Sequence, residues 1–286
     1  MEKFNYQGVQ DVEGRPYENL FIYLLEGYVN PEDEKILGNN FLGNWVEGEY
    51  SFLFFSNPAG EKITNLLGYR QNLKLMDEYR FSYEEWQGGL PETIQIENFL
   101  IVSPWTKSIP EFNGIRIWLD PGVVFGNGLH PTTRDCLKAL RLTHNQRPFN
   151  EVLDLGTGTG VLSIAAARLG AKKIMAVDLN PLCTRTAVGN VERNNLDHII
   201  KVTEARAEDL VDEPADLVMA NIHHAVIKPL IDNRKFKRGE RIIFSGLMRS
   251  QFREIKDQLT SRNFRIIKTW DHEMIWFTAL GVKSEE

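Results

Sequence analysis

The sequence has few cysteines, no long apolar run and no excess of positive charge. Its 286 residues include two cysteines, Cys136 and Cys183, which provide neither a disulfide framework nor a metal-ligand pair. No window approaches the run of about 18 apolar residues that spans a membrane. Residues 1–20 carry charges where a signal peptide would have its apolar core. These absences predict a cytoplasmic protein with reduced thiols and no membrane contact.

The scarcity of positive charge also limits the possible partners. The formal net charge is −6, which argues against a broad basic face for nucleic acid. The six histidines are scattered except for the pair His223 and His224. Because adjacent side chains do not face the same way on a helix or strand, this pair is a poor metal clamp. We therefore expect neither a metal site nor broad contact with nucleic acid.

The C-terminal half alternates between short apolar runs and amphipathic runs. The runs typical of strands lie at residues 150–155, 172–179, 198–205, 215–222, 240–247, 264–270 and 273–282. Helical patterns lie between them, including 161–170, a segment that begins at Asn180-Pro181, and 250–262. Such alternation predicts a Rossmann-like α/β domain, with a mostly parallel sheet covered by helices on both faces.

The N-terminal half has a different pattern. Strand-like runs at 18–28, 49–56 and 71–81 are accompanied by short helical patterns at 31–38 and 58–68. This mixture predicts a small α+β domain over residues 1–80; its role as a substrate-recognition domain is implied only by the family resemblance described below.

Glycine and proline mark the boundary between the two halves. Residues 81–96 contain Gly88-Gly89 and Pro91 and are expected to be a linker. The runs 97–105 and 114–120 are predicted to form a hairpin attached to the second domain, which then covers residues 97–286.

A glycine loop, DLGTGTG, follows the first strand of the second domain. Such a loop lets backbone N–H groups and a helix N-terminus approach a ligand closely. A dinucleotide fingerprint would place its third glycine where Val161 stands. The spacing D-x-G-x-G-x-G, from Asp154 to Gly160, instead resembles the first motif of class I S-adenosylmethionine-dependent methyltransferases.

Asp178 ends the next predicted strand. A carboxylate at that place accepts hydrogen bonds from both hydroxyls of a ribose, and NAD enzymes use the same arrangement. Asp178 therefore indicates a nucleoside without naming the cofactor, and the alternative is an ordinary solvated acid at a strand end.

A second glycine-rich stretch, DPGVVFGNGLHPTT, precedes the first loop and covers residues 120–133. Pro131 stands where a helix would begin, with His130 before it, and the apolar spacing predicts a helix to about residue 142. The N–H groups of Thr132 and Thr133 in its first turn form an anion site suited to a methionine carboxylate. The alternative is that the threonines cap the helix themselves.

This second stretch resembles the segment before the glycine loop in the PrmA family, the methyltransferases of the eleventh protein of the large ribosomal subunit. The family pattern is roughly D-P-G-x-x-F-G-T-G-x-H-x-T-T, and the chain departs from it at Asn127. Further similar segments are 84–87, 100–105, 220–222 and 245–251. The resemblance covers the chain from about residue 80 to its end.

The resemblance implies a class I methyltransferase domain that binds S-adenosyl-L-methionine, and it implies cofactor contacts for Thr133, Gly156, Asp178 and Asn221. Three further cofactor-binding residues are expected from their places in the loops: Asp154, Gly158 and Phe125. Phe125 is expected to stack on the adenine or to wall the methionine pocket, although an apolar loop anchor is the alternative.

The resemblance also implies the reaction, which is N-methylation of lysine and α-amino groups of a large-subunit ribosomal protein. Asn221 is followed by Ile-His-His rather than by the Pro-Pro-Tyr typical of enzymes that methylate planar amino groups. We therefore assign Asn221 to positioning a flexible aliphatic amine. His223 or His224 serves either as a proton relay or as a polar helix start.

Three other functions remain open from the sequence. The first keeps the chemistry but changes the acceptor to another protein or a small amine. The second is a non-catalytic module that only binds the cofactor. The third is a nicotinamide oxidoreductase, which Val161 argues against.

Overall fold

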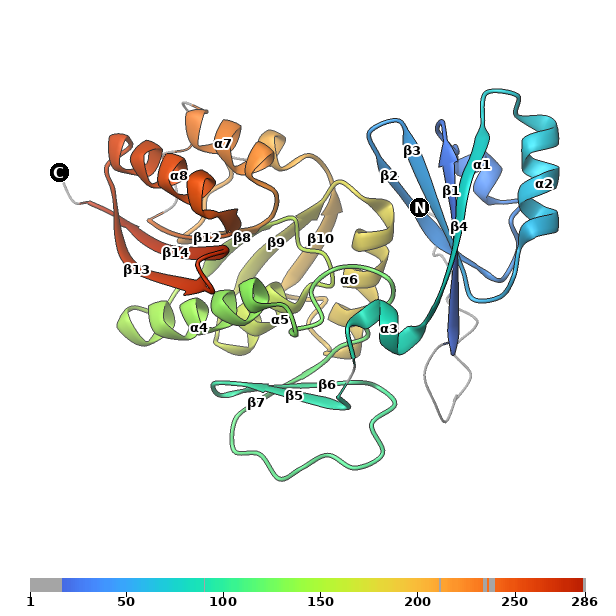
Figure 1. Ribbon diagram of the computed structural model, residues 1–286. Coiled ribbons are helices and arrows are strands. Elements are labelled where there is room, and N and C mark those ends of the chain that lie inside the picture. The colour runs from blue at the N-terminus through green and yellow to red at the C-terminus, as the bar shows by residue number, and fades with distance from the viewer. Residues whose placement is uncertain (1–16, 90, 211, 234–235, 237–239, 285–286) are drawn as a thin grey trace. The chain divides into compact units, whose positions relative to one another are not determined.

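The computed structural model describes residues 17–89, 91–210, 212–233, 236 and 240–284 (Figure 1). The chain divides into two compact units, of which the first comprises the chain up to Glu92 together with Ser103–Ile109. The second comprises Thr93–Val102 and the chain from Pro110 onward. The segment 1–16, part of the stretch in which we expected no signal peptide, lies outside the described residues. No helix in the described part of the chain has the length and apolar character to cross a membrane.

The first unit contains a four-stranded antiparallel sheet in the order β2-β3-β1-β4. The strands are β1 (Asn19–Glu26), β2 (Phe41–Glu47), β3 (Tyr50–Phe55) and β4 (Lys74–Ser82), and the helices are α1 (Pro31–Glu34) and α2 (Gly60–Tyr69). Leu53, Phe55, Ile63 and Leu66 from β3 and α2 form the centre of its core. The strand and helix patterns read from the sequence are confirmed, while β2 was not predicted.

Where a linker was expected over residues 81–96, the described residues contain the end of β4, a helix and a strand. Helix α3 (Tyr83–Gln87) begins with a capping box, in which Ser82 Oγ accepts the Glu85 N–H at 3.1 Å and the Glu85 carboxylate accepts the Ser82 N–H at 2.7 Å. The helix ends at Gly88, whose φ of +75° suits glycine. The Gly-Gly pair therefore stops a helix.

A separate three-stranded sheet, in the order β5-β6-β7, precedes the main sheet of the second unit. It consists of β5 (Thr93–Ile96), β6 (Phe99–Val102) and β7 (Ile115–Trp118). The predicted hairpin between the runs 97–105 and 114–120 is wrong, because β6 pairs with β7 in parallel and with β5 in antiparallel. The actual hairpin turns at Glu97 and Asn98, and Glu97 takes the left-handed φ of +51° that a two-residue turn requires.

The main sheet of the second unit has seven strands in the order β10-β9-β8-β11-β12-β14-β13. These are β8 (Glu151–Leu155), β9 (Lys173–Asp178), β10 (Ile200–Glu204), β11 (Leu217–Asn221), β12 (Arg241–Met248), β13 (Phe264–His272) and β14 (Trp276–Lys283). Strands β8 to β12 pair in parallel, and β14 runs antiparallel to both β12 and β13. The predicted mostly parallel sheet is confirmed.

Helices cover both faces of this sheet (Figure 1). They are α4 (Pro131–Gln146), α5 (Val161–Arg168), α6 (Pro181–Arg193), α7 (His224–Asp232) and α8 (Arg249–Ser261), with a 3-10 turn at Ala207–Leu210. One buried cluster lies beneath α4, α5 and α6 and includes Leu137, Ile164 and Val191. A second cluster lies beneath α7 and α8 and includes Ile227 and Ile255.

The strand order fixes where ligands can approach. From β8 the chain proceeds outward through β9 and β10, and it then returns to β11 on the other side of β8. Such a reversal opens a crevice at the carboxyl ends of the parallel strands. Leu155, Asp178 and Asn221 end β8, β9 and β11 at this edge, so the predicted site residues meet there.

Candidate functional site: two loops at the carboxyl edge of the sheet

The glycine loop after β8 is held close to its neighbours. The N–H groups of Gly156 and Thr157 both donate to Val177 O of β9, at 2.7 and 2.9 Å. Gly156 has a φ of +73°, and a Cβ on it would lie 1.9 Å from Ile222 Cγ2. Only glycine fits at this position, which brings the loop against the end of β11.

Gly158 brings the glycine loop close to the second loop and to Asp178. Its φ is +54°, and a Cβ would lie 2.6 Å from Phe125 O in the second loop. Its N–H donates to Asp178 Oδ2 at 3.0 Å. The backbone of the glycine loop thus lies between the Phe125 carbonyl and the carboxylate that ends β9.

Asp178 is half-buried, and burial raises the pKa of its carboxyl above the ordinary value. Its second oxygen, Oδ1, accepts the Asn180 N–H at 3.0 Å, beside the Asn180 cap of α6. An ionised carboxylate only accepts hydrogen bonds, which is what the hydroxyls of a ribose require. The position suits a ribose.

Asp154 is 1% exposed, and burial raises its pKa to about 6. Its Oδ2 accepts the hydroxyls of Thr157 at 2.7 Å and Ser163 at 2.6 Å. Its Oδ1 has no hydrogen-bond partner among the described residues. A buried carboxylate oxygen without a partner costs folding free energy, and it is suited to a cationic group of a ligand.

Thr159 connects the glycine loop to the second loop. Its N–H donates to Phe125 O at 3.2 Å, and its hydroxyl donates to Gly126 O at 2.9 Å. A Cβ on Gly126 would lie 2.7 Å from Thr159 Oγ1, so the contact is tight. The two glycine-rich loops are therefore one hydrogen-bonded structure.

Asn127, where the second loop departs from the pattern that it resembles, has a structural role. Its Oδ1 accepts the Leu129 N–H at 2.9 Å, which closes a turn two residues ahead. A threonine hydroxyl forms the same kind of turn, although more weakly. Both residue types are therefore suited to a turn at this position.

The N-terminus of α4 follows this loop and is capped by His130. The His130 ring accepts the Thr132 N–H at 3.4 Å, and its Nδ1 lies 2.7 Å from Thr132 Oγ1. The cap of the Thr132 N–H is thus a histidine rather than a threonine. Burial, and His272 nearby, lower the pKa of His130, so the ring is neutral at physiological pH.

Thr133 and Asn221 meet across the site. Asn221 Nδ2 donates to Thr133 Oγ1 at 3.5 Å, which connects the end of β11 with the first turn of α4. Gly246 of β12 lies alongside, since a Cβ on it would come within 3.4 Å of Asn221 Oδ1. Two residues from distant parts of the sequence are thus brought together.

The two histidines after Asn221 have separate structural roles. His223 caps α7 by accepting the Ala225 N–H at 3.3 Å, as the interpretation of a polar helix start predicts. His224 Nε2 lies 3.0 Å from the Glu254 carboxylate on α8.

Trp276, at the start of β14, was missed by the sequence analysis. Its ring centroid lies 5.3 Å from that of His130, and the Phe125 ring lies 5.1 Å from His130 on the same cluster. Phe125 is 48% exposed. The three rings form an aromatic wall beside the first turn of α4, and no pattern in the sequence indicates that Trp276 belongs to it.

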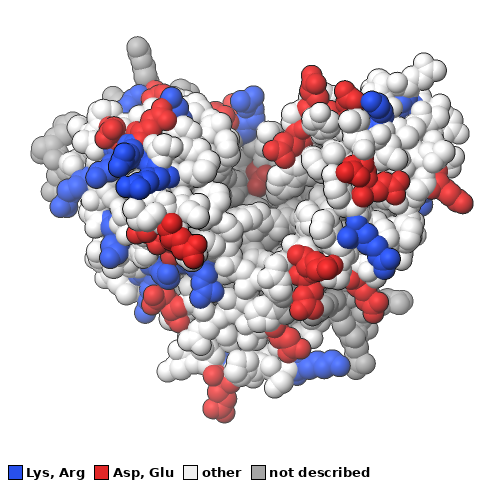
Figure 2. All heavy atoms as spheres, in the orientation of Figure 1, with Lys and Arg blue, Asp and Glu red and all other residues white. Residues whose placement is uncertain are grey.

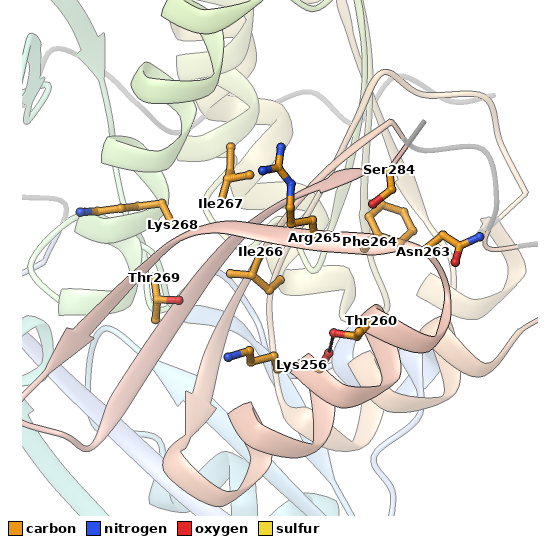
Figure 3. Close-up of a pocket in the computed structure, with 10 residues that line it drawn as sticks. All are labelled: Lys256, Thr260, Asn263, Phe264, Arg265, Ile266, Ile267, Lys268, Thr269 and Ser284. Carbon is orange, nitrogen blue, oxygen red and sulfur yellow. Dashed lines mark hydrogen bonds between the residues drawn. The ribbon is translucent and has the colours of Figure 1, made fainter. Parts of the chain in front are cut away.

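A groove of about 540 Å³ elsewhere in the second unit is not this site. It lies between α8 and the edge strand β13, and Figure 3 shows Lys256 and Thr260 projecting from α8 toward that strand. None of the predicted site residues lines it.

Over the face in Figure 2, Lys and Arg side chains are interspersed with Asp and Glu. The described residues contain no group of three His, Cys, Asp or Glu side chains able to hold a metal ion.

The sheet and the site together define a class of protein. When the strands β8 to β14 are numbered 1 to 7 along the chain, their order in the sheet is 3-2-1-4-5-7-6, and strand 7 is antiparallel to its neighbours. A glycine loop follows strand one, and a carboxylate ends strand two. This is the class I methyltransferase fold. The chain belongs to the ribosomal protein L11 methyltransferase (PrmA) family, whose model matches residues 62–284.

Individual relatives agree with this assignment. A ribosomal protein L11 methyltransferase of Geobacillus kaustophilus is 40% identical over 173 residues, which are 59% of this chain and 55% of the relative. One of Anoxybacillus flavithermus is 33% identical over 262 residues, or 87% of this chain and 80% of the relative. The match to the Geobacillus protein thus spans little more than half of that relative's length.

Among solved structures, a ribosomal protein L11 methylase from Lactobacillus delbrueckii subsp. bulgaricus is similar, with a TM-score of 0.60 and 29% sequence identity. The alignment covers 68% of this chain and 100% of that one.

Proposed function

We propose that this protein transfers methyl groups from S-adenosylmethionine to amino groups of a protein, and that ribosomal protein L11 is the acceptor. The observation that carries the proposal is the joining of the two loops through Thr159, beside the contact between Thr133 and Asn221. Together with the family membership, this geometry supports a single pocket for the cofactor and an acceptor site next to it.

The residues at the edge fit each part of the cofactor. Asp178 would accept the ribose hydroxyls, and the unpartnered Oδ1 of Asp154 would accept the methionine ammonium. The first turn of α4 at Thr133 would bind the methionine carboxylate, because helix N-termini favour anions. Phe125 would lie against the cofactor, since its half-exposed ring is not a core anchor. The cofactor supplies a methyl group activated by its sulfonium.

On the acceptor side, Asn221 would orient the amine. Its side-chain oxygen and the neighbouring carbonyls accept N–H bonds, which leaves the nitrogen lone pair free to point at the methyl group. A lysine amine with a pKa of about 10.4 must lose a proton first, and a desolvated site favours its neutral form. The neutral His130 ring, with Phe125 and Trp276, would provide that apolar surrounding.

The glycine spacing disfavours the nicotinamide alternative. Val161 occupies the place of the third dinucleotide glycine, and it is 2% exposed in the first turn of α5. A dinucleotide site uses glycine there for close packing of the helix on the strand.

Labelled S-adenosylmethionine and purified L11 test the proposal. We expect the label to enter L11 in the presence of the protein, at lysine side chains or the α-amino group. Cofactor binding without incorporation into L11, but with incorporation into another protein of a cell extract, would assign a different acceptor. Binding without any transfer would leave only a cofactor-binding module.

The pH dependence of cofactor binding tests the role of Asp154. Its pKa is raised to about 6, so the carboxyl loses its charge as the pH falls through that value and can no longer pair with an ammonium. We expect the dissociation constant for S-adenosylhomocysteine to be flat above pH 7 and about tenfold higher one unit below the pKa. Calorimetric titrations between about pH 5 and 8, a range that brackets this pKa, measure the dissociation constant.

The matched control is Asp154→Asn, which cannot ionise. Asp178 also has a raised pKa, and the variant separates the two carboxyls. We expect the variant to bind weakly at every pH and with a shallower pH profile. A variant that binds as tightly as the wild type would remove Asp154 from the cofactor site.

A further inference from the structure

Two asparagines at the C-terminal end of α6, Asn190 within the helix and the C-cap residue Asn194, are each 1% exposed. They lie one helical turn apart on the face that packs toward β7 and the two loops. A buried amide without hydrogen-bond partners destabilises the fold. The partners of each amide therefore indicate its role.

Asn190 pairs with the backbone at the start of the second loop and also reaches the glycine loop. The Asp120 N–H donates to Asn190 Oδ1 at 2.8 Å, and Asn190 Nδ2 donates to Asp120 O at 2.8 Å. The same Nδ2 donates to Thr159 O at 3.0 Å. One side chain thus binds both loops.

Asn194 forms the same pairing without reaching either loop. The Trp118 N–H donates to Asn194 Oδ1 at 3.1 Å, and Asn194 Nδ2 donates to Trp118 O at 2.7 Å. Its other bond from Nδ2 goes to Asn190 O at 2.8 Å. Asn194 therefore makes as many amide bonds as Asn190, but all of these go to β7 and to α6 itself.

We propose that Asn190 is a positioning residue for the cofactor pocket, and that it sets the distance between the two loops. The Thr159 carbonyl accepts a hydrogen bond from Asn190. The Thr159 N–H and hydroxyl in turn donate to the carbonyls of Phe125 and Gly126. The carbonyl of Asp120, at the start of the second loop, accepts a hydrogen bond from the same amide. Removing the Asn190 amide removes the hydrogen bonds that join both loops to α6 at once.

The proposal rests on the proposed function, because it concerns the pocket that would hold S-adenosylmethionine. A merely structural asparagine would affect stability without affecting the pocket. The comparison of Asn190 with Asn194 separates the two roles, since both are buried to the same degree on one helix.

The test compares Asn190→Ala with Asn194→Ala in the full-length protein. Melting temperatures and calorimetric dissociation constants for S-adenosylhomocysteine are measured for both and for the wild type. We expect the two variants to lose similar thermal stability. Only Asn190→Ala is expected to bind S-adenosylhomocysteine about tenfold or more weakly, with Asn194→Ala within about twofold of the wild type. In transfer assays, Asn190→Ala should raise the KM for the cofactor and leave kcat at saturating cofactor within about threefold.

Equal affinity of Asn190→Ala and the wild type, or equal losses in both variants, would overturn the proposal. If Asn190→Ala does not fold, Asn190→Ser takes its place and the same two outcomes apply, because serine keeps only one donor for two carbonyls. Failure of the proposed function is distinguishable, because it shows in the wild type itself, either as no binding of S-adenosylhomocysteine or as binding without methyl transfer to L11.

Discussion

Replacing Gly156 with alanine is expected to raise the dissociation constant for S-adenosylhomocysteine by about a hundredfold or more. The φ of +73° costs a residue with a Cβ about 1–2 kcal/mol, and overpacking adds about 1–3 kcal/mol. The new Cβ would lie 1.9 Å from Ile222 Cγ2, so the Ile222 side chain or the loop must move. A hundredfold loss corresponds to about 2.7 kcal/mol. Calorimetry measures the affinity, and thermal unfolding measures the accompanying loss of stability.

Gly189 on α6 provides the matched control for this substitution. A Cβ there meets no heavy atom within 4 Å among the atoms described, and its φ lies outside the left-handed region. Gly189→Ala is expected to stabilise the helix by about 0.5–1 kcal/mol and to leave cofactor affinity unchanged. If Gly156→Ala bound the cofactor as well as Gly189→Ala does, the glycine loop would not form the pocket.

The second large effect is expected for Asn221→Ala, with a fall in kcat of about a hundredfold. Removing one positioned hydrogen-bonding group from a reacting centre commonly costs about 10²–10³ in rate. Cofactor affinity should change by less than about tenfold, because the Asn221 amide lies 3.5 Å from Thr133 at one side of the pocket. Steady-state kinetics at saturating cofactor separates the loss in kcat from a loss in binding.

Asn221→Asp is the control, because it keeps an oxygen acceptor in a side chain of the same shape. It should retain more activity than Asn221→Ala. Wild-type kcat in the alanine variant would place the acceptor amine elsewhere, and equal losses in the two variants would show that the side-chain oxygen is not the important group.

The second unit was predictable because its parallel strands are buried on both faces. The stretches 217–220 and 242–244 are continuously apolar, and caps such as Asn180-Pro181 mark the helix starts. In the first unit, strand β2 has no such signal, because Gly43 and Asn44 in its interior lower its strand propensity.

The hairpin error has a specific physical cause. The turn between β5 and β6 uses Glu97 and Asn98 rather than an Asn-Gly pair, so the sequence gives little sign of it. Strand β7 was assigned to β6 because the two follow each other along the chain. Their pairing is parallel, which requires the longer connection that residues 103–114 provide.

The site was predictable where backbone chemistry leaves a local pattern. Gly156 and Gly158 are needed for their left-handed φ, and Pro131 for the helix start, so these show in the sequence. Asn190 and Trp276 act through contacts that join distant segments. A single sequence contains no sign of such contacts, and the link through Thr159 was likewise visible only in the structure.

Amide hydrogen exchange of the wild-type protein with and without S-adenosylhomocysteine tests the central claim, that the two loops form one cofactor pocket. The expected result is slower exchange in both segments together, 120–133 and 154–162, and in the same range of ligand concentration. Protection confined to 154–162, with 120–133 unchanged, would contradict the account, and so would equal protection of 154–162 by NAD.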